Sequence, residues 1–592
     1  DLGAFMGPMV MTGRGWIAAG LAEPTLWVNG EQYRMVYNVQ TTRYLPGKLI
    51  QEYNDENLNF TTELCYLTSR SVAIRSIVKN MSQKPVKVSF DWNGGVYEPT
   101  SVVSSIDKGL SFIRPKDSTN TVIRFLTADK IQAVGSDSLH VTEKSEMTLE
   151  PGKTYQSEMT QTLTLRGEDT AKELAAIATL NIDNCFELNE QQWNAQIASL
   201  LSGNSKYLKD NKYRKVLVKA MMTLNSNYRT PAGDILHGGS NPSYNGFING
   251  IWSWDSWKIA SGNVHFNEEI AKSEMITLFD YQADNGMVPD FISYNKKYNN
   301  WRDAKPPVAA WGAMNVYKAT GDKKFLETMF DKLYKFHQWW YAERDHNHNG
   351  ICEYGSTDGT LIAACWESGM DNGVRFDDAV MQKNSEKAWS MNQENICLNS
   401  FLYVDKTILA EMATLLNKPE LAAQLNAEAK VIKEFVQTKM WDKETGFFYD
   451  TRIDTGEHIK VMGAECWLPL WAGIATPEQA KQVMQKMMDP QKFNSTLPLG
   501  TLDISHPRLR PVRGYWRGPV WVDQVYFGIT GLRNYGFDRE ADILTEKFIN
   551  NAQGLTTDGP IHENYNPLTG EALNSPNFGW SSACIIKMLL DE

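Results

Sequence analysis

The hydrophobic pattern of this chain changes near Asp169, and the change restricts the chain to a two-part architecture. Before that point, short runs such as Ser71–Val78, Val86–Trp92 and Thr121–Leu126 alternate apolar and polar residues and are separated by Gly, Asn, Asp and Pro. Alternation with a period of two is typical of strands that bury one face. Several short strands in succession favour an antiparallel sandwich. We therefore predict an N-terminal antiparallel β-sandwich over residues 1–168.

The remainder of the chain carries helical periodicity. Residues 169–205 are predicted to be linker helices, with one continuous helix from Thr170 to Leu201. Further helices are predicted over residues 206–228, 255–264, 267–283, 306–319, 323–342, 398–416, 419–439, 464–473, 476–487, 519–535, 537–552 and 579–590. Helices in hairpin order with long loops on one side predict an all-α (α/α)6 barrel, or toroid, over residues 206–592. The functional residues are then expected in the loops at one end of the barrel.

The composition of the chain limits the classes of molecule that it can bind. Its net charge is −11 and no basic stripe occurs, which argues against nucleic acid and fits a neutral or cationic small substrate. No apolar run reaches the length of a membrane span. The seven Cys are odd in number and form no CxxC pair, so neither a disulfide framework nor a zinc site is expected. The chain begins at Asp1 without Met, from which we expect a removed signal peptide and a periplasmic or secreted protein, with the cytoplasm as the alternative.

Two loop segments each place a carboxylate among aromatic and amide side chains. They are Trp366–Asn372, which contains Asp371, and Ile561–Pro567, which contains Glu563. Cleavage of a glycosidic bond uses one carboxyl group to protonate the leaving oxygen and another to activate water or attack the sugar. We predict Asp371 and Glu563 as these catalytic groups. The alternatives are a helix N-cap for Asp371 and a solvated loop residue for Glu563.

Aromatic clusters near the same loops predict a sugar-binding surface, because rings stack on the apolar faces of sugars. The 19 Trp and 24 Tyr could equally fill a helix-rich core. Asp255 could hold sugar hydroxyls or cap a helix, and Arg517 could keep a carboxylate ionised or bridge two helices. The predicted substrate-binding residues are Trp252, Trp254, Asp255, Trp257, Trp301, Trp366, Glu367, Trp516, Arg517, Trp521 and Tyr565.

A separate loop, Asp345–Glu353, has the spacing that opens a calcium-binding loop. The predicted ligands are Asp345, Asn347, Asn349, the carbonyl of Ile351, Glu353 and, from elsewhere in the chain, Glu394. Position 12 of the loop is Ser356, so the pattern departs from an EF-hand. One structural Ca²⁺ is expected and no organic cofactor, since phosphate-binding and serine-hydrolase motifs are missing from the sequence. The alternative is a linker rich in Asx turns.

Taken together, these motifs resemble glycoside hydrolase family 63, and most closely its bacterial α-glucosidase type. Besides the segments above, the resemblance rests on Tyr515–Gln524 and Asp558–Gly570, and more weakly on Asp1–Ala4 and the β-rich pattern. It implies a β-sandwich followed by a catalytic (α/α)6 barrel and hydrolysis with inversion. It also implies Asp371 as general acid, Glu563 as general base, and a calcium ion whose ligands include Glu394. An inverting pair should lie ~6.5–9.5 Å apart.

The leading hypothesis is an inverting, exo-acting glycosidase that removes terminal α-linked glucose from oligosaccharides or small glycosides. One alternative is a glycosidase of another specificity, such as a mannosylglycerate- or glucosylglycerate-type hydrolase or a trehalase-like enzyme. A phosphorylase on the same barrel is disfavoured by Glu563. An alternative of another class is an inactive carbohydrate-binding protein. A monomer or weak oligomer is expected.

Overall fold

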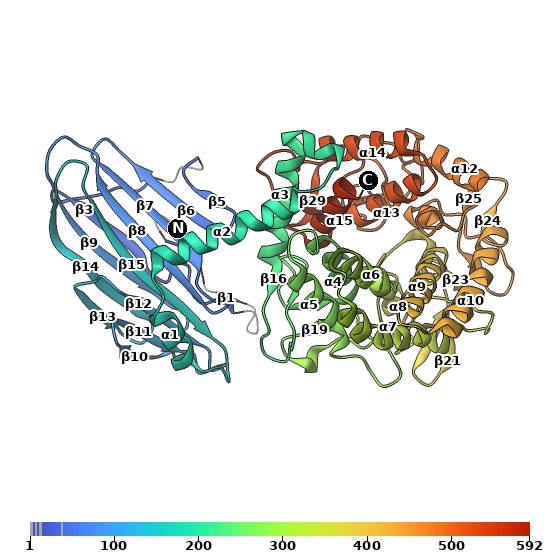
Figure 1. Ribbon diagram of the computed structural model, residues 1–592, viewed down its shortest axis with the longest axis horizontal. Helices are drawn as coiled ribbons and strands as arrows, with labels where there is room; N and C mark the ends of the chain where they lie inside the picture. Colours follow the sequence, from blue (N-terminus) through green and yellow to red (C-terminus); the bar gives the residue numbers. More distant parts are fainter. Residues whose placement is uncertain (1–3, 6, 8, 11–14, 37–39, 592) are drawn as a thin grey trace. The chain divides into compact units, whose positions relative to one another are not determined.

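The computed structural model describes residues 4–5, 7, 9–10, 15–36 and 40–591 (Figure 1). Asp1–Gly3, part of the weaker end of the resemblance, lie outside the described residues. The chain divides into two compact units, Asp1–Ala198 and Ser199–Glu592. The predicted change from a β-rich to a helical pattern is confirmed. In the described part of the chain, no helix is long and apolar enough to cross a membrane.

The described residues of the first unit form two large antiparallel sheets and one short ribbon. In spatial order, the larger sheet consists of β10 (Val102–Ile106), β11 (Gly109–Ile113), β12 (Asn120–Phe125), β15 (Thr154–Thr164), β8 (Ser71–Asn80), β7 (Leu58–Tyr66), β6 (Lys48–Asn54) and β5 (Arg43–Leu45). The smaller sheet consists of β13 (Lys130–Val134), β14 (Ser138–Leu149), β9 (Val86–Gly95), β3 (Glu23–Val28) and β4 (Glu31–Gln32). A short ribbon of β1 (Met9–Val10) and β2 (Gly15–Trp16) precedes them.

The core of this unit lies between the sheets. Alternate residues of β7 and β9 point inward, and the rings of Phe60 and Phe90 meet edge to face with centroids 6.0 Å apart. Trp92 packs against Phe90 in the same core. Burial of each such ring stabilises the fold by roughly 1.5–3 kcal/mol. The period-two pattern of the sequence therefore exists because one face of each strand packs on the opposing sheet.

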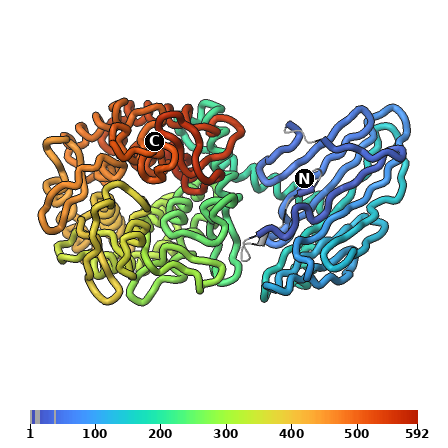
Figure 2. The backbone as a smooth tube through the Cα atoms, turned by 180° about the vertical axis from the view of Figure 1, so that it is seen from behind, coloured from blue at the N-terminus to red at the C-terminus, as the bar shows by residue number. Residues whose placement is uncertain are grey.

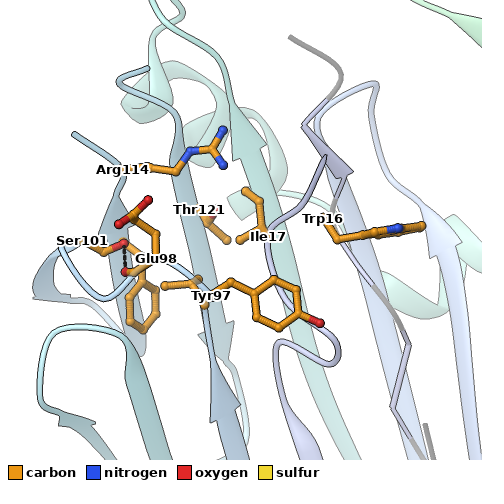
Figure 3. Close-up of a pocket in the computed structure, with 9 residues that line it drawn as sticks. Trp16, Ile17, Tyr97, Glu98, Ser101, Arg114 and Thr121 are labelled. Carbon is orange, nitrogen blue, oxygen red and sulfur yellow. Dashed lines mark hydrogen bonds between the residues drawn. The ribbon is translucent and has the colours of Figure 1, made fainter. Parts of the chain in front are cut away.

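A small pocket opens on the surface of the first unit (Figure 3). Ile17 and Thr121 lie at its centre, and Tyr97, Glu98 and Arg114 surround them. None of its lining residues comes from the predicted catalytic or sugar-binding segments.

The predicted helix from Thr170 to Leu201 is interrupted. The structure has α1 (Thr170–Ala178) and α2 (Ile182–Leu200) instead. The interruption has a local cause, because the Asn181 side chain accepts a hydrogen bond of 2.8 Å from the Asn184 amide and so starts a new helix. Periodicity alone could not detect this break, since the apolar spacing continues across it.

A helix occupies each of the later predicted ranges, within the part of the chain that the structure describes. These helices are α3 (Asn211–Asn227), α4 (Ser253–Asn263), α5 (Glu268–Phe279), α6 (Ala309–Thr320), α7 (Lys323–Glu343), α9 (Ile396–Leu415), α10 (Pro419–Thr438), α11 (Leu468–Trp471), α12 (Pro477–Met487), α13 (Val522–Asn534), α14 (Asp538–Asn551) and α15 (Gly579–Leu590). A further short helix, α8 (Leu361–Glu367), forms where the sequence indicated only a buried run.

Six of these helices pack in a closed cycle. Helix α4 packs on α6, α6 on α9, α9 on α11, α11 on α13, α13 on α15, and α15 again on α4. Outside this cycle, α3 packs on α15, α5 on α4, α7 on α6 and α9, α10 on α9, and α14 on α13. Helices α3 and α15 therefore lie side by side although they stand at opposite ends of this unit in sequence (Figures 1 and 2). Every residue of α4 is buried, as expected for a helix with neighbours all round.

Candidate active site

Asp371 lies in a tight turn that follows α8. The Thr360 side chain caps the start of this helix, and Ser368 ends it. Gly369 has φ +69°, and a Cβ at this position would lie 2.3 Å from the Trp254 ring. Both facts require glycine, because other residues rarely adopt this conformation and none would fit. The turn thus packs the acid loop against α4, and Asp371 follows two residues after the contact between Gly369 and Trp254.

The Asp371 carboxyl group is poorly solvated. Burial raises its pKa to about 6. The positive charge of Lys305 opposes this rise, and the negative charge of Asp290 adds to it. A carboxyl group that holds its proton in this range can donate it to a leaving oxygen.

Glu563 lies in the middle strand of a small sheet formed by β27 (Val520–Trp521), β28 (His562–Tyr565) and β29 (Ala572–Pro576). This residue is 2 % exposed. The Tyr515 hydroxyl donates to Oε1 at 3.0 Å, and the Ser575 amide donates to Oε2 at 3.2 Å. Burial raises the pKa of Glu563 to about 7, and the charge of Asp371 contributes to the rise. The two predicted catalytic carboxyl groups therefore interact electrostatically.

Tyr515 holds Glu563 from a strained backbone. It is a non-glycine residue with φ +58°, a conformation that costs on the order of 1–3 kcal/mol and is retained where surroundings impose it. The Trp521 indole N–H donates to the Tyr515 carbonyl at 2.9 Å and fixes that conformation. Tyr515 lies within the Tyr515–Gln524 motif, but the sequence pattern indicated no role for it.

Asn372 joins the acid loop to the segment that carries Tyr515. Its Oδ1 accepts a hydrogen bond from the Trp516 amide at 3.0 Å, and its Nδ2 donates to the Gly514 carbonyl at 3.0 Å. Arg517 donates from Nε to the Asn372 carbonyl at 2.8 Å and pairs with Asp377. Of the two roles weighed for Arg517, the structure places it in a bridge, here between two loops.

Buried charges gather beside Asp371. Lys305 Nζ lies 3.3 Å from Asp290 and 3.9 Å from Asp303, and Asn300 donates to both carboxylates. Burial raises the pKa of the neighbouring Asp255 to about 8. The sequence motifs indicated Asp255 but not Asp290, Asp303 or Lys305. The charges of Asp303 and Lys305, directly before a Pro-Pro pair, were the available signal.

Tryptophan side chains pack against one another in the segments next to the two carboxyl groups. Trp516 and Trp521 stack with centroids 3.9 Å apart and planes 7° apart. The Lys258 ammonium lies between the rings of Trp254 and Trp580, 3.3 Å and 3.5 Å from their centroids, and pairs with Asp523 at 2.9 Å. This cation fixes two indoles at once, since both attract it through their ring faces.

Three other predicted aromatic residues retain accessible surface. Trp252 is half-buried against Phe291, with centroids 4.5 Å apart. Trp366 is half-buried beneath the Arg302 guanidinium, 5.0 Å from the ring. Trp301 is 37 % exposed.

Four predicted substrate-binding residues, Trp521 among them, have no accessible surface. Trp257 packs against Phe279 and Phe336. Tyr565 accepts a hydrogen bond of 2.9 Å from the His562 amide through its hydroxyl. Glu367 binds Arg344 through both carboxylate oxygens, each at 2.8 Å. A side chain without accessible surface cannot stack on or bond a sugar, so this placement gives no support to their predicted role.

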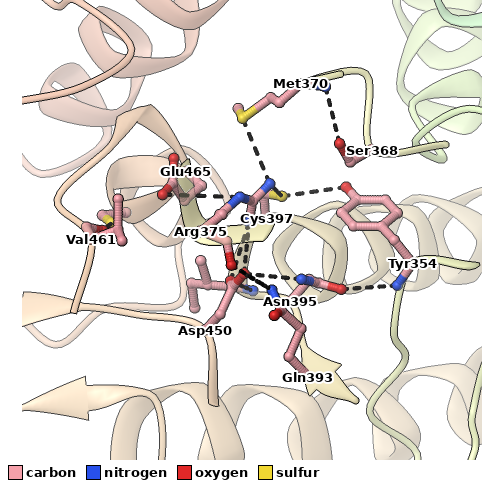
Figure 4. Close-up of polar contacts among 12 residues, drawn as sticks. Tyr354, Ser368, Met370, Arg375, Gln393, Asn395, Cys397, Asp450, Val461 and Glu465 are labelled. Atoms are coloured by element: carbon pink, nitrogen blue, oxygen red, sulfur yellow. Dashed lines mark hydrogen bonds and ion pairs between the residues drawn. The ribbon is translucent and has the colours of Figure 1, made fainter. Parts of the chain in front are cut away.

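A buried polar network underlies the acid loop (Figure 4). The Arg375 guanidinium binds Asp450 at 3.0 Å and contacts the sulfur atoms of Cys397 at 3.1 Å and Met370 at 3.6 Å. Glu465 approaches the same guanidinium at 4.0 Å. Met370 precedes Asp371, so the network fixes the backbone from which the predicted acid projects.

The predicted calcium loop gathers oxygen atoms, although the described residues contain no group of three or more His, Cys, Asp or Glu side chains arranged to hold a metal ion. Asp345 Oδ1 and Oδ2 accept bonds from the amides of Asn349 and Gly350. Asn349 Nδ2 reaches Glu394 at 2.8 Å and connects the loop to the distant residue predicted to join it. Glu353 Oε1 is buried without a hydrogen-bond partner, and burial raises the pKa of this carboxyl group well above its usual range.

The helical unit and its two poorly solvated carboxyl groups are consistent with a glycoside hydrolase, and comparison with known families shows that class. Residues 249–581, more than half of the chain, match the family model of the mannosylglycerate hydrolase MGH1-like glycoside hydrolase domain. The chain belongs to glycoside hydrolase family 63, as the sequence motifs predicted.

Among similar proteins, a mannosylglycerate hydrolase of Rubrobacter radiotolerans is 27% identical over 57% of this chain and 90% of its own. A glucosylglycerate hydrolase of Mycolicibacterium hassiacum is 23% identical over 57% of this chain and 91% of its own. A family 63 mannosylglycerate hydrolase of Thermus thermophilus, solved with glucose, superposes with a TM-score of 0.52. It is 25% identical and covers 63% of this chain and 99% of its own.

Proposed function

We propose that this protein hydrolyses a small α-glycoside whose aglycone carries a carboxylate, such as an α-mannosyl- or α-glucosylglycerate. The observation that carries the proposal is the pair of poorly solvated, electrostatically interacting carboxyl groups, Asp371 and Glu563. The similar mannosylglycerate and glucosylglycerate hydrolases favour this specificity over the α-glucosidase type that the motifs first indicated.

In the proposed mechanism, Asp371 donates its proton to the glycosidic oxygen while Glu563 removes a proton from a water on the opposite face of the sugar. The Tyr515 hydroxyl and the Ser575 amide hold Glu563 in place for that water. Asp255 and the accessible rings of Trp252, Trp301 and Trp366 would bind the sugar. Attack by a water held between the two carboxyl groups would invert the configuration at the anomeric carbon.

A basic segment supports an anionic aglycone. Arg510 and Arg513 lie shortly before Tyr515 in a chain whose net charge is −11. Arg510 and Arg513 are exposed. Planar guanidinium groups bind carboxylates well, because two parallel N–H donors match two oxygens. We propose that this segment attracts the carboxylate of the leaving group.

Proton NMR from the first minute of reaction tests the proposal. The panel contains α-mannosylglycerate, α-glucosylglycerate, their uncharged α-glycerol counterparts, trehalose and the α-linked glucose disaccharides. Early β-sugar from the glycerates and slower release from the glycerol analogues would support it. Early α-sugar would overturn inversion, and equal rates for charged and uncharged substrates would overturn the anionic aglycone.

A second candidate is the α-glucosidase activity first predicted from the motifs. The half-buried Trp252 and Trp366 and the exposed Trp301 favour it, because such rings could bind the further sugar units of an oligosaccharide. Faster hydrolysis of the glucose disaccharides than of the glycerates in the same panel would select it. An inactive binding protein would release no sugar from any member.

We also propose that the closed cycle of helices is the inner wall of an (α/α)6 toroid, with α3, α5, α7, α10, α12 and α14 outside it. The cyclic packing supports this arrangement. The unpaired oxygen of Glu353 and the oxygen-rich loop around Asp345 support a structural Ca²⁺ held by the predicted ligands. Such an ion would offset two of the three negative charges of Asp345, Glu353 and Glu394. Equilibrium dialysis against ⁴⁵Ca²⁺ tests it, and failure to retain one ion per chain would contradict it.

We also propose that the protein is exported and that it is a monomer or a weak oligomer. Export to the periplasm or medium is tested by fractionation of the producing cells, where recovery with cytoplasmic markers would contradict it. A monomer or weak oligomer is tested by sedimentation equilibrium.

A further inference from the structure

The Lys219 ammonium is surrounded by carbonyl oxygens of the loop that precedes β28. It contacts the carbonyl oxygens of Gly554, Leu555 at 2.8 Å, Thr557 at 3.0 Å and Gly559 at 2.8 Å. An ammonium group has three N–H donors, so four oxygens exceed the hydrogen bonds it can make. Several oxygens around one positive charge is the arrangement that proteins build around bound cations.

The loop is shaped to turn these oxygens inward. Gly554 has φ +90°, and a Cβ there would lie 2.9 Å from the Pro560 carbonyl oxygen. Leu555 is buried beneath the turn. Converging carbonyl dipoles that are partly removed from water cost free energy unless a positive charge lies among them. The loop therefore requires a cation, and Lys219 supplies it from α3.

The same loop leads directly into the strand of the proposed base. Pro560 ends it, Ile561 is fully buried, and Glu563 follows two residues later. Helix α3 is held in turn by α15 (Figure 1). We propose that residues 554–559 form a monovalent-cation site occupied by the Lys219 ammonium, and that Lys219 is thereby a positioning residue for Glu563. The second part rests on the proposed role of Glu563 as base.

The test removes the built-in cation and offers another. The midpoint of thermal unfolding, Tm, of Lys219→Ala is measured in choline chloride, KCl and NH₄Cl at equal ionic strength, beside wild type and Lys215→Ala. Lys215 is exposed on the same helix and serves as the matched control. We expect Lys219→Ala to lose about 4 °C or more in choline, and to recover part of it saturably with K⁺ or NH₄⁺. Equal salt responses of all three proteins would overturn the cation site.

The positioning role has its own measurement. Hydrogen bonds from Ser575 and Tyr515 lower the pKa of Glu563, so a displaced strand should raise that pKa. With a glycosyl fluoride, which leaves without protonation, the acidic limb of kcat/KM reports Glu563 alone and should move to higher pH. We expect NH₄⁺ to move it back in Lys219→Ala. Recovery of Tm without movement of the limb would overturn the positioning role, whereas full turnover by Glu563→Gln would instead overturn the proposed function. If Lys219→Ala does not fold, Lys219→Met keeps the aliphatic stem and allows the limb comparison.

Discussion

Asp371 and Glu563 differ in what surrounds them, and that difference suits different tasks. Asp371 is half-buried near Lys305, whereas Glu563 is buried and accepts two hydrogen bonds that orient its oxygens. We expect Asp371→Asn and Glu563→Gln each to lower kcat by about 10²–10⁴-fold. The exposed Asp378 is the matched control, and Asp378→Asn should retain full activity. Initial rates on the preferred glycoside measure this, and wild-type rates in both variants would refute the assignment.

The pKa values of the pair predict a narrow pH profile. Glu563 must be ionised and has a pKa of about 7, while Asp371 must be protonated and has a pKa of about 6. Because the pKa of the base lies above that of the acid, only a minority of molecules holds the productive pair even at the optimum. That minority falls below the optimum as Glu563 gains a proton, and above it as Asp371 loses one. Since the groups interact, these limbs belong to the pair. We expect a bell-shaped kcat/KM centred at about pH 6.5.

A substrate that needs no acid separates the two limbs. A glycosyl fluoride leaves without protonation, so its profile should keep the acidic limb and lose the alkaline one. Retention of both limbs would show that the alkaline limb does not report Asp371.

Residue identity was easier to predict than residue environment. The carboxylates of the acid and base loops and Asp255 were identified from aromatic neighbours, and in the structure all three lie within electrostatic range of Tyr515. Asp290, Asp303 and Lys305 were missed because their proximity to Asp371 depends on how distant loops meet. Trp257 and Tyr565 were placed at the sugar although they are core residues, because adjacency in sequence does not reveal which face of an element is buried.

Between elements, Asn372 is the principal link from the acid loop to the segment around Tyr515. Asn372→Ala removes two hydrogen bonds and leaves the Trp516 amide and the Gly514 carbonyl without these partners. We expect the free energy of unfolding to fall by about 1–3 kcal/mol and kcat/KM to fall roughly 10-fold, because the carboxyl groups lose their alignment. Urea unfolding and steady-state kinetics measure both effects.

Asn550→Ala provides the comparison for that change, since Asn550 makes an exposed side-chain bond to Lys212 outside the site. It should change neither quantity appreciably. If Asn372→Ala behaves in the same way, the two loops are aligned by other contacts.

Helices and strands were predicted correctly where the hydrophobic periodicity of the sequence matches the face that the element buries. Each long amphipathic segment became a helix, and alternating runs became strands. The break between α1 and α2 arose from a side-chain cap, and α8 was too short for periodicity to identify. The small sheet that carries Glu563 joins strands from separate segments, so no local pattern could have predicted it.

At the scale of the whole molecule, the two compact units differ in their relation to similar proteins. The Thermus thermophilus structure matches over 99% of its own chain but over 63% of this one. The family match lies wholly within residues 199–592. Both proposed catalytic residues and every charge described around them also lie there.

We therefore predict that a shortened chain of residues 199–592 folds and hydrolyses small glycosides. The physical reason is that a compact unit with its own buried helices can fold alone, and α4 is already buried by neighbours within this unit. Circular dichroism, a cooperative thermal transition and kcat on the preferred glycoside measure the outcome. A folded but inactive fragment would show that residues 1–198 contribute to catalysis, and an unfolded one would show that they are needed for stability.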